Sequence, residues 1–391
     1  MYFKREIEGI IQSLRTQYPC LVLTGARQVG KTTLLRHCFP EYNFVSLDLP
    51  SLAEMAESDT QAFLTAYPAP LIIDEVQYAP KLFRNLKVAI DKDRHRMGQF
   101  ILTGSQKFTL MREVSDSLAG RAAIVSIENL SAKELSLDSG SDWADVLARG
   151  FYPELWRQRE MDRHQFYASY VASYLERDVR QILNVQSLRD FERFLRACAA
   201  RSGQLLNMSE LGRDVGIKAQ TAKDWISVLE ASNQISLLEP YFENLGKRIV
   251  KSPKLYLNDP GLLCFLLGVE PQNLPSSPLM GAAWETFVYA EFRKAATAHG
   301  QPGNLWFYRD DQGREVDFIK QHHGRLDLFE VKWSENPDQK WFDRINEVAG
   351  ILRQSKTQNP GQARLLCRTR HAFRRDNVSC EHVTDYFRGQ V

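Results

Sequence analysis

The sequence lacks the charge imbalance and the cysteine patterns that mark several special classes of protein. Its 391 residues carry 50 basic and 48 acidic side chains, a formal net charge of +2. This balance argues against a protein that coats nucleic acid, although it leaves room for a local basic patch. The six cysteines form no CxxC pair and have no histidine spacing suited to zinc. We interpret them as reduced, mostly buried thiols of a cytoplasmic protein.

Long apolar runs are missing as well. The longest ones, such as "GLLCFLLGV", fall far short of the roughly 20 residues that span a bilayer, so no membrane segment is expected. The charged N-terminus "MYFKREIEGI" has no apolar core of a secretory signal. What is present, 43% hydrophobic and 25% charged residues, is typical of ordinary globular domains. The length predicts two or three of them.

The order of apolar patterns predicts an α/β protein with several domains. Residues 1–128 alternate helical patterns with the strand candidates "CLVLTG", "YNFVSLD", "PLIIDE", "QFILTG" and "AAIVSI", as in a parallel sheet buried on both faces. Residues 129–185 are expected to form a helical lid or connector. Three helices and then two strands predict a winged helix at 186–268. A helix followed by further strand candidates predicts a smaller α/β domain at 269–391, after a proline-rich linker.

The stretch "GARQVGKTTL" contains a complete G-x-x-x-x-G-K-[ST] motif between an expected strand and an expected helix. Glycines let the amides of such a loop turn toward an anion, and the helix dipole points at the phosphates. Lys31 is expected to reach the β- and γ-phosphates, and Thr32 to ligate Mg²⁺. The predicted nucleotide-binding residues are Gly25, Ala26, Arg27, Gln28, Val29, Gly30, Lys31, Thr32 and Thr33.

A second stretch, "PLIIDEVQ", ends another expected core strand with two acidic residues. Alone, such a pair would be interpreted as surface acids that close a strand. After a complete phosphate-binding loop, Asp74 is expected to hold Mg²⁺ through water. Glu75 is expected to orient and deprotonate the attacking water. The two motifs together predict nucleotide hydrolysis.

The stretches "QFILTGSQ" and "SLAGRAAIVSI" follow, and this arrangement resembles that of the AAA-type ATPases. The resemblance implies a polar residue that senses the γ-phosphate, here Ser105, with Thr103 as the alternative. It also implies an arginine that reaches the nucleotide, often from a neighbouring subunit of a homo-oligomer. Arg121 is the first candidate for that arginine, and Arg112 and Arg177 compete with it.

The segment "ELGRDVGIKAQTAKDWISVLE" has a helix-turn-helix pattern whose second helix can enter a DNA major groove. The residues expected on its outer face are Lys218, Gln220, Thr221, Lys223 and Asp224. The basic residues expected to contact phosphates from the wing are Lys247, Arg248, Lys251 and Lys254. Nucleic acid is therefore the expected partner. The alternative is a winged helix that packs on the ATPase or binds protein.

The C-terminal part holds a second constellation, Asp317 in "EVDFI" with Glu330 and Lys332 in "FEVKW". Two carboxylates and a lysine on adjacent strands suit a Mg²⁺ site that activates water. The order resembles the PD-(D/E)xK nucleases, and that resemblance adds Glu285 on the preceding helix. The sequence departs from the pattern because Val316, not proline, precedes Asp317. The alternatives are solvated strand charges, or a nuclease-like fold kept for binding.

Along the whole chain, further motifs occur in one order, including "GFYPELW", "YLERDVRQI", "LYLNDPGLLCFLLG" and "WETFV". With the nucleotide motifs, they resemble a prokaryotic family of AAA-type ATPases with a C-terminal domain of uncharacterised function. The resemblance implies ATP as the nucleotide, a winged helix and a nuclease-like fold. The resulting hypothesis is a cytoplasmic Mg²⁺-dependent ATPase whose nucleotide state controls the later domains, acting on nucleic acid. The alternative is a nucleotide-gated protein-binding switch without nuclease activity.

Overall fold

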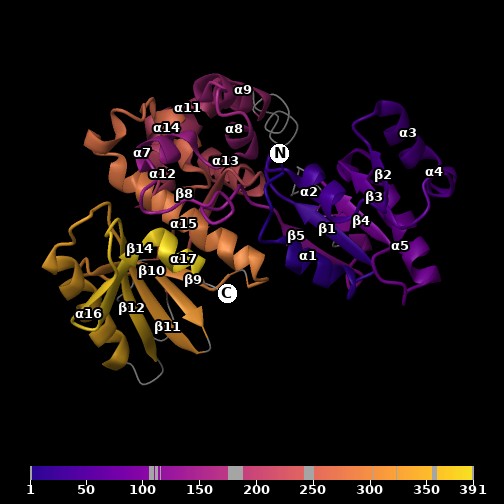
Figure 1. The fold of residues 1–391 in the computed structure, drawn as a ribbon. Helices are drawn as coiled ribbons and strands as arrows, with labels where there is room; N and C mark the ends of the chain where they lie inside the picture. Colours follow the sequence, from indigo (N-terminus) through magenta and orange to yellow (C-terminus); the bar gives the residue numbers. More distant parts are fainter. Residues whose placement is uncertain are drawn as a thin grey trace.

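The computed structural model describes residues 2–104, 110, 113–114, 116–174, 188–241, 251–301, 303–322, 324–354 and 359–389. The helices are α1 (Glu8–Arg15), α2 (Lys31–Cys38), α3 (Pro50–Ser58), α4 (Thr60–Ala66), α5 (Leu82–Lys92), α7 (Trp143–Arg149), α8 (Pro153–Arg157), α9 (Arg163–Tyr174), α11 (Leu188–Ala199), α12 (Met208–Val215), α13 (Ala219–Ala231), α14 (Pro260–Leu267), α15 (Met280–Ala298), α16 (Gln339–Gln354) and α17 (Val383–Arg388). The strands are β1 (Cys20–Thr24), β2 (Asn43–Ser46), β3 (Leu71–Asp74), β4 (Phe100–Thr103), β5 (Ala122–Ser126), β6 (Gln204–Leu205), β7 (Ile235–Leu238), β8 (Lys254–Leu257), β9 (Leu305–Arg309), β10 (Glu315–His322), β11 (Arg325–Val331), β12 (Pro360–Cys367), β13 (Phe373–Arg375) and β14 (Val378–His382). In Figure 1 the N-terminal sheet lies on the right, a helical part at upper left, and the C-terminal sheet at lower left.

The first sheet is parallel throughout, in the order β2-β3-β4-β1-β5. Each expected apolar run forms one of its strands, which confirms the predicted α/β class. The inner strands β1, β3 and β4 are buried along their whole length. The edge strands are not, and Ile124 of β5 is 46% exposed. Burial on both faces therefore holds only where a strand has two neighbours and helices on either side.

The helical part is organised around a buried carboxylate at the start of α14. Asp259 is 1% exposed and accepts hydrogen bonds from the Leu262 N–H at 2.9 Å and the Phe151 N–H at 2.8 Å. It therefore caps α14 and also fixes the loop that leads to α8. The loop passes so close that a Cβ on Gly261 would lie 2.6 Å from the Gly150 nitrogen. The motifs "GFYPELW" and "LYLNDPGLL" thus meet in space, although the sequence indicates no role for them.

Helices α11, α12 and α13 pack beside a small antiparallel sheet in the order β6-β8-β7. Gly216 ends α12 with φ +81°, a left-handed conformation that makes the tight turn toward α13. Phe191 and Phe194 of α11 contact Trp225 of α13 with ring centroids 5.1 and 5.2 Å apart. The expected order of helix, helix, helix and antiparallel strand pair is therefore present.

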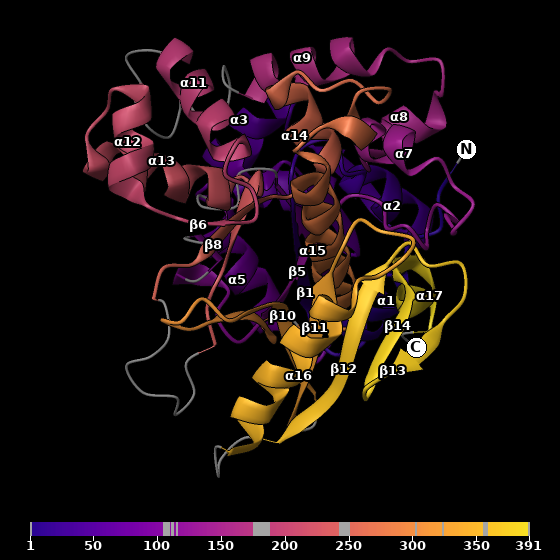
Figure 2. The same ribbon diagram turned by 90° about the vertical axis from the view of Figure 1, so that its left-hand side faces the viewer.

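The C-terminal sheet has the order β13-β14-β12-β11-β10-β9. Helix α16 packs its apolar side on one face, while α15 and α17 cover the other. Figure 2 shows α15 running through the centre of the molecule, between the helical part and this sheet. The proline-rich segment expected as a linker is packed, because Leu274 is fully buried and Met280 is 3% exposed.

Two expectations from the composition concern the chain as a whole. Across the part of the chain that the structure describes, no helix is long and apolar enough to cross a membrane. All six cysteines fall within it, and each is free. Five of them are buried and Cys38 is partly buried, in agreement with thiols that serve as small apolar side chains.

Candidate functional site

The phosphate-binding loop leaves β1 at the carboxyl end of the parallel sheet and enters α2 at Lys31. Gly25 has φ +147°, and a Cβ there would lie 2.3 Å from the carbonyl oxygen of Ile127. Gly30 precedes the helix with φ +91°. Both glycines are therefore required by backbone conformation, and at Gly25 also by the close passage of the segment after β5.

Within the loop, the Lys31 side chain folds back over the backbone. Its Nζ donates to the carbonyl oxygens of Gly25 at 3.0 Å and Ala26 at 2.8 Å, and the residue is 6% exposed. The ammonium group is thus held inside the curve of residues 25–31. That is the position from which a lysine can move onto a phosphate bound by the loop amides.

The residues predicted to bind the metal ion meet at the carboxyl ends of β3 and β4. The Thr32 hydroxyl donates to Asp74 Oδ2 at 2.9 Å, and the Thr103 hydroxyl donates to Asp74 Oδ1. Asp74 is the last residue of β3 and Thr103 the last of β4, adjacent parallel strands whose carboxyl ends meet at one edge. The structure therefore brings together Thr32, Asp74 and the alternative sensor residue Thr103. The first choice for the sensor, Ser105, lies outside the described residues.

Glu75 follows Asp74 and adopts the left-handed conformation with φ +55°. Its backbone N–H donates to the Thr103 hydroxyl at 3.4 Å, and its carboxylate accepts a hydrogen bond from the side-chain amide of Gln77. Gln77 is 6% exposed, so this partner is fixed by packing. Gln77 is not among the residues that the sequence predicts for the site. The only signal was its position two residues after the acid in "DEVQ".

Arg121 lies at the amino ends of the parallel strands, on the side of the sheet opposite to the phosphate-binding loop. It immediately precedes β5, and its carbonyl accepts from the N–H of Cys20, the first residue of β1. Its guanidinium binds both carboxylate oxygens of Asp91 on α5, at 2.7 and 2.9 Å. The loop of residues 25–30 follows the carboxyl end of β1, whereas Arg121 lies at the amino end of β5. Because the two strands are parallel, Arg121 cannot reach the loop of its own chain. A role toward a neighbouring subunit stays a prediction, while Arg112 and Arg177 fall outside the described residues.

A cavity of about 660 Å³ adjoins the phosphate-binding loop. Its walls combine loop and α2 residues with the N-terminal segment and the region of α8 and α9, and include Tyr2, Phe3, Gln28, Thr33, Pro153 and Phe166. Arg5 fixes the wall, because its guanidinium donates to the Val29 carbonyl at 3.1 Å and the Glu128 carbonyl at 2.7 Å. This role of "MYFKR" could not be predicted from the sequence, since an aromatic pair followed by basic residues is not a recognised motif.

In the C-terminal part, the structure brings together Glu285 from α15, Asp317 from β10, and Glu330 and Lys332 at the end of β11. Lys332 Nζ lies 2.7 Å from Glu330 Oε1 and 3.3 Å from Asp317 Oδ2. Asp317 Oδ2 also accepts from the Val331 N–H at 2.8 Å. The antiparallel pairing of β10 with β11 places these groups side by side, as the alternation of the two strands predicts.

A fifth residue enters this cluster from another part of the chain. Lys254, the first residue of β8, has its Nζ 2.6 Å from Glu315 Oε1, 3.2 Å from Glu285 Oε1 and 3.9 Å from Asp317 Oδ1. The residue is 2% exposed. The prediction that Lys254 contacts phosphates from the wing is therefore wrong. Burial against three carboxylates outweighs the tendency of a lysine to stay in water, and sequence position alone did not reveal them.

The charges in this cluster shift one another strongly. Burial and the nearby Asp317 raise the pKa of Glu330 to about 8. Burial alone would raise the pKa of Asp317, but Lys332 and Lys254 outweigh it and lower that pKa. Glu330 Oε2 is buried and has no hydrogen-bond partner among the described residues. The cluster therefore contains one carboxylate that the surrounding protein leaves incompletely satisfied.

These sites can be set beside known proteins. Family models match three successive parts of the chain: an AAA domain at residues 17–136, a domain of unknown function (DUF8612) at 140–273, and another (DUF4143) at 280–386. Two mycobacterial proteins, uncharacterized protein Rv2008c of Mycobacterium tuberculosis and Mb2031c of Mycobacterium bovis, are each 32% identical over 340 residues. The match covers 85% of this chain and 75% of each relative. The chain therefore belongs to the same family as these two uncharacterized mycobacterial proteins.

The AAA domain contains the phosphate-binding loop, Asp74 and Thr103, so the AAA-type P-loop domain precedes the two domains of unknown function in this chain. The carboxylate cluster belongs to the second domain of unknown function. Solved structures resemble the chain more distantly. The Walker-type ATPase PABY2304 of Pyrococcus abyssi is 18% identical with a TM-score of 0.42, covering 68% of this chain and 96% of that one. Thermotoga maritima RuvB is 18% identical with a TM-score of 0.33, covering 60% and 89%.

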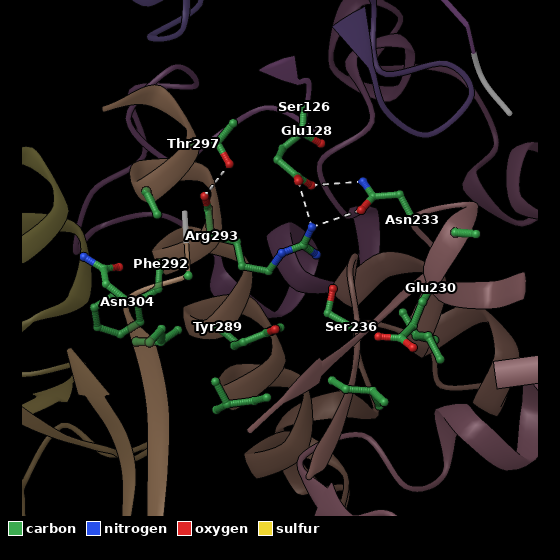
Figure 3. Close-up of a pocket in the computed structure, with 17 residues that line it drawn as sticks. Ser126, Glu128, Glu230, Asn233, Ser236, Tyr289, Phe292, Arg293, Thr297 and Asn304 are labelled. Atoms are coloured by element: carbon green, nitrogen blue, oxygen red, sulfur yellow. Dashed lines mark hydrogen bonds and ion pairs between the residues drawn. The ribbon is translucent and has the colours of Figure 1, made fainter. Parts of the chain in front are cut away.

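The three parts of this chain meet at one junction. Arg293 of α15 binds Glu128 Oε1 at 2.7 Å and Asn233 Oδ1 at 3.0 Å, and the Asn233 amide donates to Glu128 Oε2 at 3.2 Å. Figure 3 shows these side chains, which come from three parts of the chain, pointing toward one another among the residues that line a cavity of about 540 Å³. Glu128 follows β5 and is the residue whose carbonyl Arg5 holds. A continuous set of contacts therefore joins the phosphate-binding loop to α15.

The outer face of α13 carries the expected polar residues. Lys218, Gln220, Lys223 and Asp224 are exposed and Thr221 is half-buried. Gln220 donates to Asp224 at 2.9 Å. Of the basic residues expected on the wing, Lys251 is exposed, Lys254 is buried, and Lys247 and Arg248 lie outside the described residues. The described part of this surface is therefore less basic than the sequence predicts.

Proposed function

We propose that this protein binds ATP with Mg²⁺ and hydrolyses it at the loop of residues 25–33. The observation that carries the proposal is the meeting of Thr32, Asp74 and Thr103 at the carboxyl ends of β3 and β4. A hydroxyl from the loop and a carboxylate at the end of another strand of the sheet are the pair that holds Mg²⁺ in P-loop ATPases. They also fit the ion by chemistry, because Mg²⁺ takes oxygen ligands and keeps several waters.

Each residue has a separate part in this proposal. Lys31 releases the carbonyls of Gly25 and Ala26 and binds the β- and γ-phosphates. When bound, Mg²⁺ neutralises the phosphate oxygens and orients them. Glu75, positioned by the Gln77 amide, takes the proton of the attacking water. The base of the nucleotide occupies the cavity lined by Tyr2 and Phe3, since apolar and aromatic walls beside the loop suit a purine ring.

The test is an ATP titration together with a turnover assay on two variants. Lys31→Ala should abolish ATP binding, while Glu75→Gln should keep binding and lose at least a hundredfold in turnover. The exposed residues Lys87 and Glu54 supply matched controls, Lys87→Ala and Glu54→Gln, which should behave as wild type. Unchanged affinity of Lys31→Ala would remove the loop from the site. Wild-type turnover of Glu75→Gln would remove Glu75 from the base role.

We further propose that the nucleotide state reaches the later domains through Arg5, Glu128 and Arg293. Arg5 touches the loop at Val29 and the junction at Glu128, so a displacement of the loop is passed to the segment after β5. That segment is ion-paired to α15, whose Glu285 belongs to the C-terminal cluster. Limited proteolysis between α14 and α15, with and without ATP, should show a nucleotide-dependent change in wild type. The change should be absent in Arg293→Met.

A second candidate activity is phosphodiester cleavage at the C-terminal cluster. It is favoured by the convergence of Glu285, Asp317, Glu330 and Lys332 that the nuclease resemblance implies. Among the residues that the structure describes, no three His, Cys, Asp or Glu side chains are already arranged around a metal position, but the Glu330 oxygen without a partner suits an oxygen-liganded divalent cation. Such a cation, when bound, would polarise the phosphate and activate water. Lys332 would stabilise the developing negative charge, because Asp317 and Glu330 outweigh burial and keep its pKa above the usual value.

The test is cleavage of single- and double-stranded DNA and RNA with Mg²⁺ or Mn²⁺, with and without ATP. Cutting by wild type that is lost in Lys332→Ala and Asp317→Asn would establish the activity. Lys340→Ala, an exposed lysine on α16, is the matched control and should cut normally. The absence of cutting on every substrate would favour the alternative function, a nucleotide-gated switch that acts through protein contacts.

Nucleic acid remains the proposed partner of the α11–α13 unit, which has the helix order of a winged helix. Two exposed lysines, Lys223 on α13 and Lys218 directly before it, are suited to phosphate contacts. Binding should weaken steeply with salt, because each neutralised phosphate releases a counterion. Lys218→Ala combined with Lys223→Ala should reduce the salt slope by about 2. Binding that is insensitive to salt, or not detectable, would favour the protein-binding switch.

A further inference from the structure

One of the two lysines in the C-terminal cluster comes from a different sheet than Asp317 and Glu330 do. Lys254 belongs to β8, which pairs with β6 and β7 beside α11–α13, whereas Asp317 and Glu330 belong to β10 and β11. Its side chain is 3% exposed and its Nζ lies within 4 Å of Glu285, Glu315 and Asp317. An ammonium group so placed does for these carboxylates what a bound metal ion does in other proteins: it offsets their buried charge.

The charges around the cluster show how much depends on this lysine. Glu285, Glu315, Asp317 and Glu330 face Lys254 and Lys332 within the cluster, with Arg309 and Arg344 at its rim. Lys332 pairs with Glu330 and Asp317, so Lys254 is the lysine that pairs Glu285. Without Lys254, the buried carboxylates would hold surplus negative charge and would require another cation or protons.

The docking of β8 on α15 determines where this cation lies. Two residues after Lys254, the Tyr256 hydroxyl donates to Glu285 Oε1 at 2.6 Å. The Tyr256 ring stacks on Tyr289 of α15 with centroids 4.2 Å apart. The same strand therefore delivers a cation and a hydrogen-bond donor to one carboxylate. Glu285 Oε1 is therefore occupied by both groups for as long as β8 stays docked, and the Lys254 ammonium group also lies 3.9 Å from Asp317 Oδ1.

We propose that Lys254 is the resident cation of the C-terminal cluster and that a divalent cation binds Glu285 and Asp317 only in its place. The two cations exclude each other because they need the same oxygens and repel at this distance. The α11–α13 unit would thereby control whether the cluster holds metal. The use of that metal rests on the second proposed function, whereas the exclusion of metal by Lys254 does not.

The test measures Mn²⁺ binding to the full chain without nucleotide. The concentration of free Mn²⁺ is monitored by electron paramagnetic resonance. All proteins carry Asp74→Asn, so that the P-loop site does not contribute. Lys254→Met should bind one Mn²⁺ at least tenfold more tightly than the parent protein. The exposed neighbour Lys251 supplies the matched control, since Lys251→Met should not change the affinity. Adding Glu285→Gln to Lys254→Met should abolish the gain.

An unchanged or weaker Mn²⁺ affinity of folded Lys254→Met would overturn the proposal. It would show that the cluster is a permanent link between β8 and α15. If Lys254→Met does not fold in chelator, refolding is repeated with Mn²⁺. Folding with the ion supports the exchange of one cation for another, and failure with it overturns the proposal. Because the readout is binding, a protein that never cuts nucleic acid can still pass this test, so the two hypotheses fail separately.

Discussion

Replacing Arg293 by methionine is predicted to weaken the junction of the three parts of the chain by a measurable amount. Arg293 Nη2 makes one hydrogen bond to the Glu128 carboxylate at 2.7 Å and one to the Asn233 amide oxygen at 3.0 Å. The Arg293 and Glu128 side chains are 20% and 11% exposed, so solvent screens the pair little. Both bonds have the charged guanidinium as donor, and a hydrogen bond to a charged group contributes about 1.5 kcal/mol at the lower end of its usual range. Arg293→Met should therefore lower the free energy of unfolding by about 3 kcal/mol.

The assay is urea unfolding of Arg293→Met, Glu128→Gln and the double variant. Because the two residues contact each other, the cycle should give a coupling energy of about 1.5 kcal/mol. Arg84→Met, at an exposed position on α5, is the control and should change stability by less than about 0.5 kcal/mol. A coupling energy below about 0.5 kcal/mol would refute the reasoning, because sites that do not interact add within that margin.

Three further predictions follow from single positions. Gly25→Ala should abolish ATP binding and cost about 3 kcal/mol of stability, because its Cβ would meet the Ile127 carbonyl at 2.3 Å; Gly281→Ala, which has open space on α15, should be tolerated in the same melting and binding assays. Arg121→Ala should leave ATP affinity unchanged in a titration of the monomer, and a loss would contradict its placement beside Asp91. Burial lowers the pKa of His382 to about 4, so the folded state binds fewer protons than the unfolded one between about pH 6.5 and 4. Stability should fall across that window as the pH is lowered, and a His382→Asn protein whose pH profile matched wild type would exclude this cause.

The arrangement of the candidate nucleotide site could be predicted from the sequence because its chemistry is local. The loop needs glycine at fixed positions and a lysine and a hydroxyl next to a helix start, all within residues 25–33. Asp74 is distant in sequence, yet an apolar run that ends in an acid identifies a buried parallel strand and its carboxyl end. The rule that parallel strands end at one edge then brings Asp74 to Thr32, and the observed 2.9 Å contact agrees with it.

The sequence by itself determined which segments form strands and helices, since apolar periodicity and glycine placement act over a few residues. Only the tertiary structure decided which charged groups are buried together. Lys254 has the sequence context of an exposed wing lysine, and its burial follows from the docking of β8 on α15. Arg5 and Arg293 also acquire their roles from contacts with residues more than a hundred positions away, at Glu128. Such pairings depend on how the domains pack, because ion pairs and hydrogen bonds form between groups that are close in space. A local sequence pattern does not specify which distant residues come close.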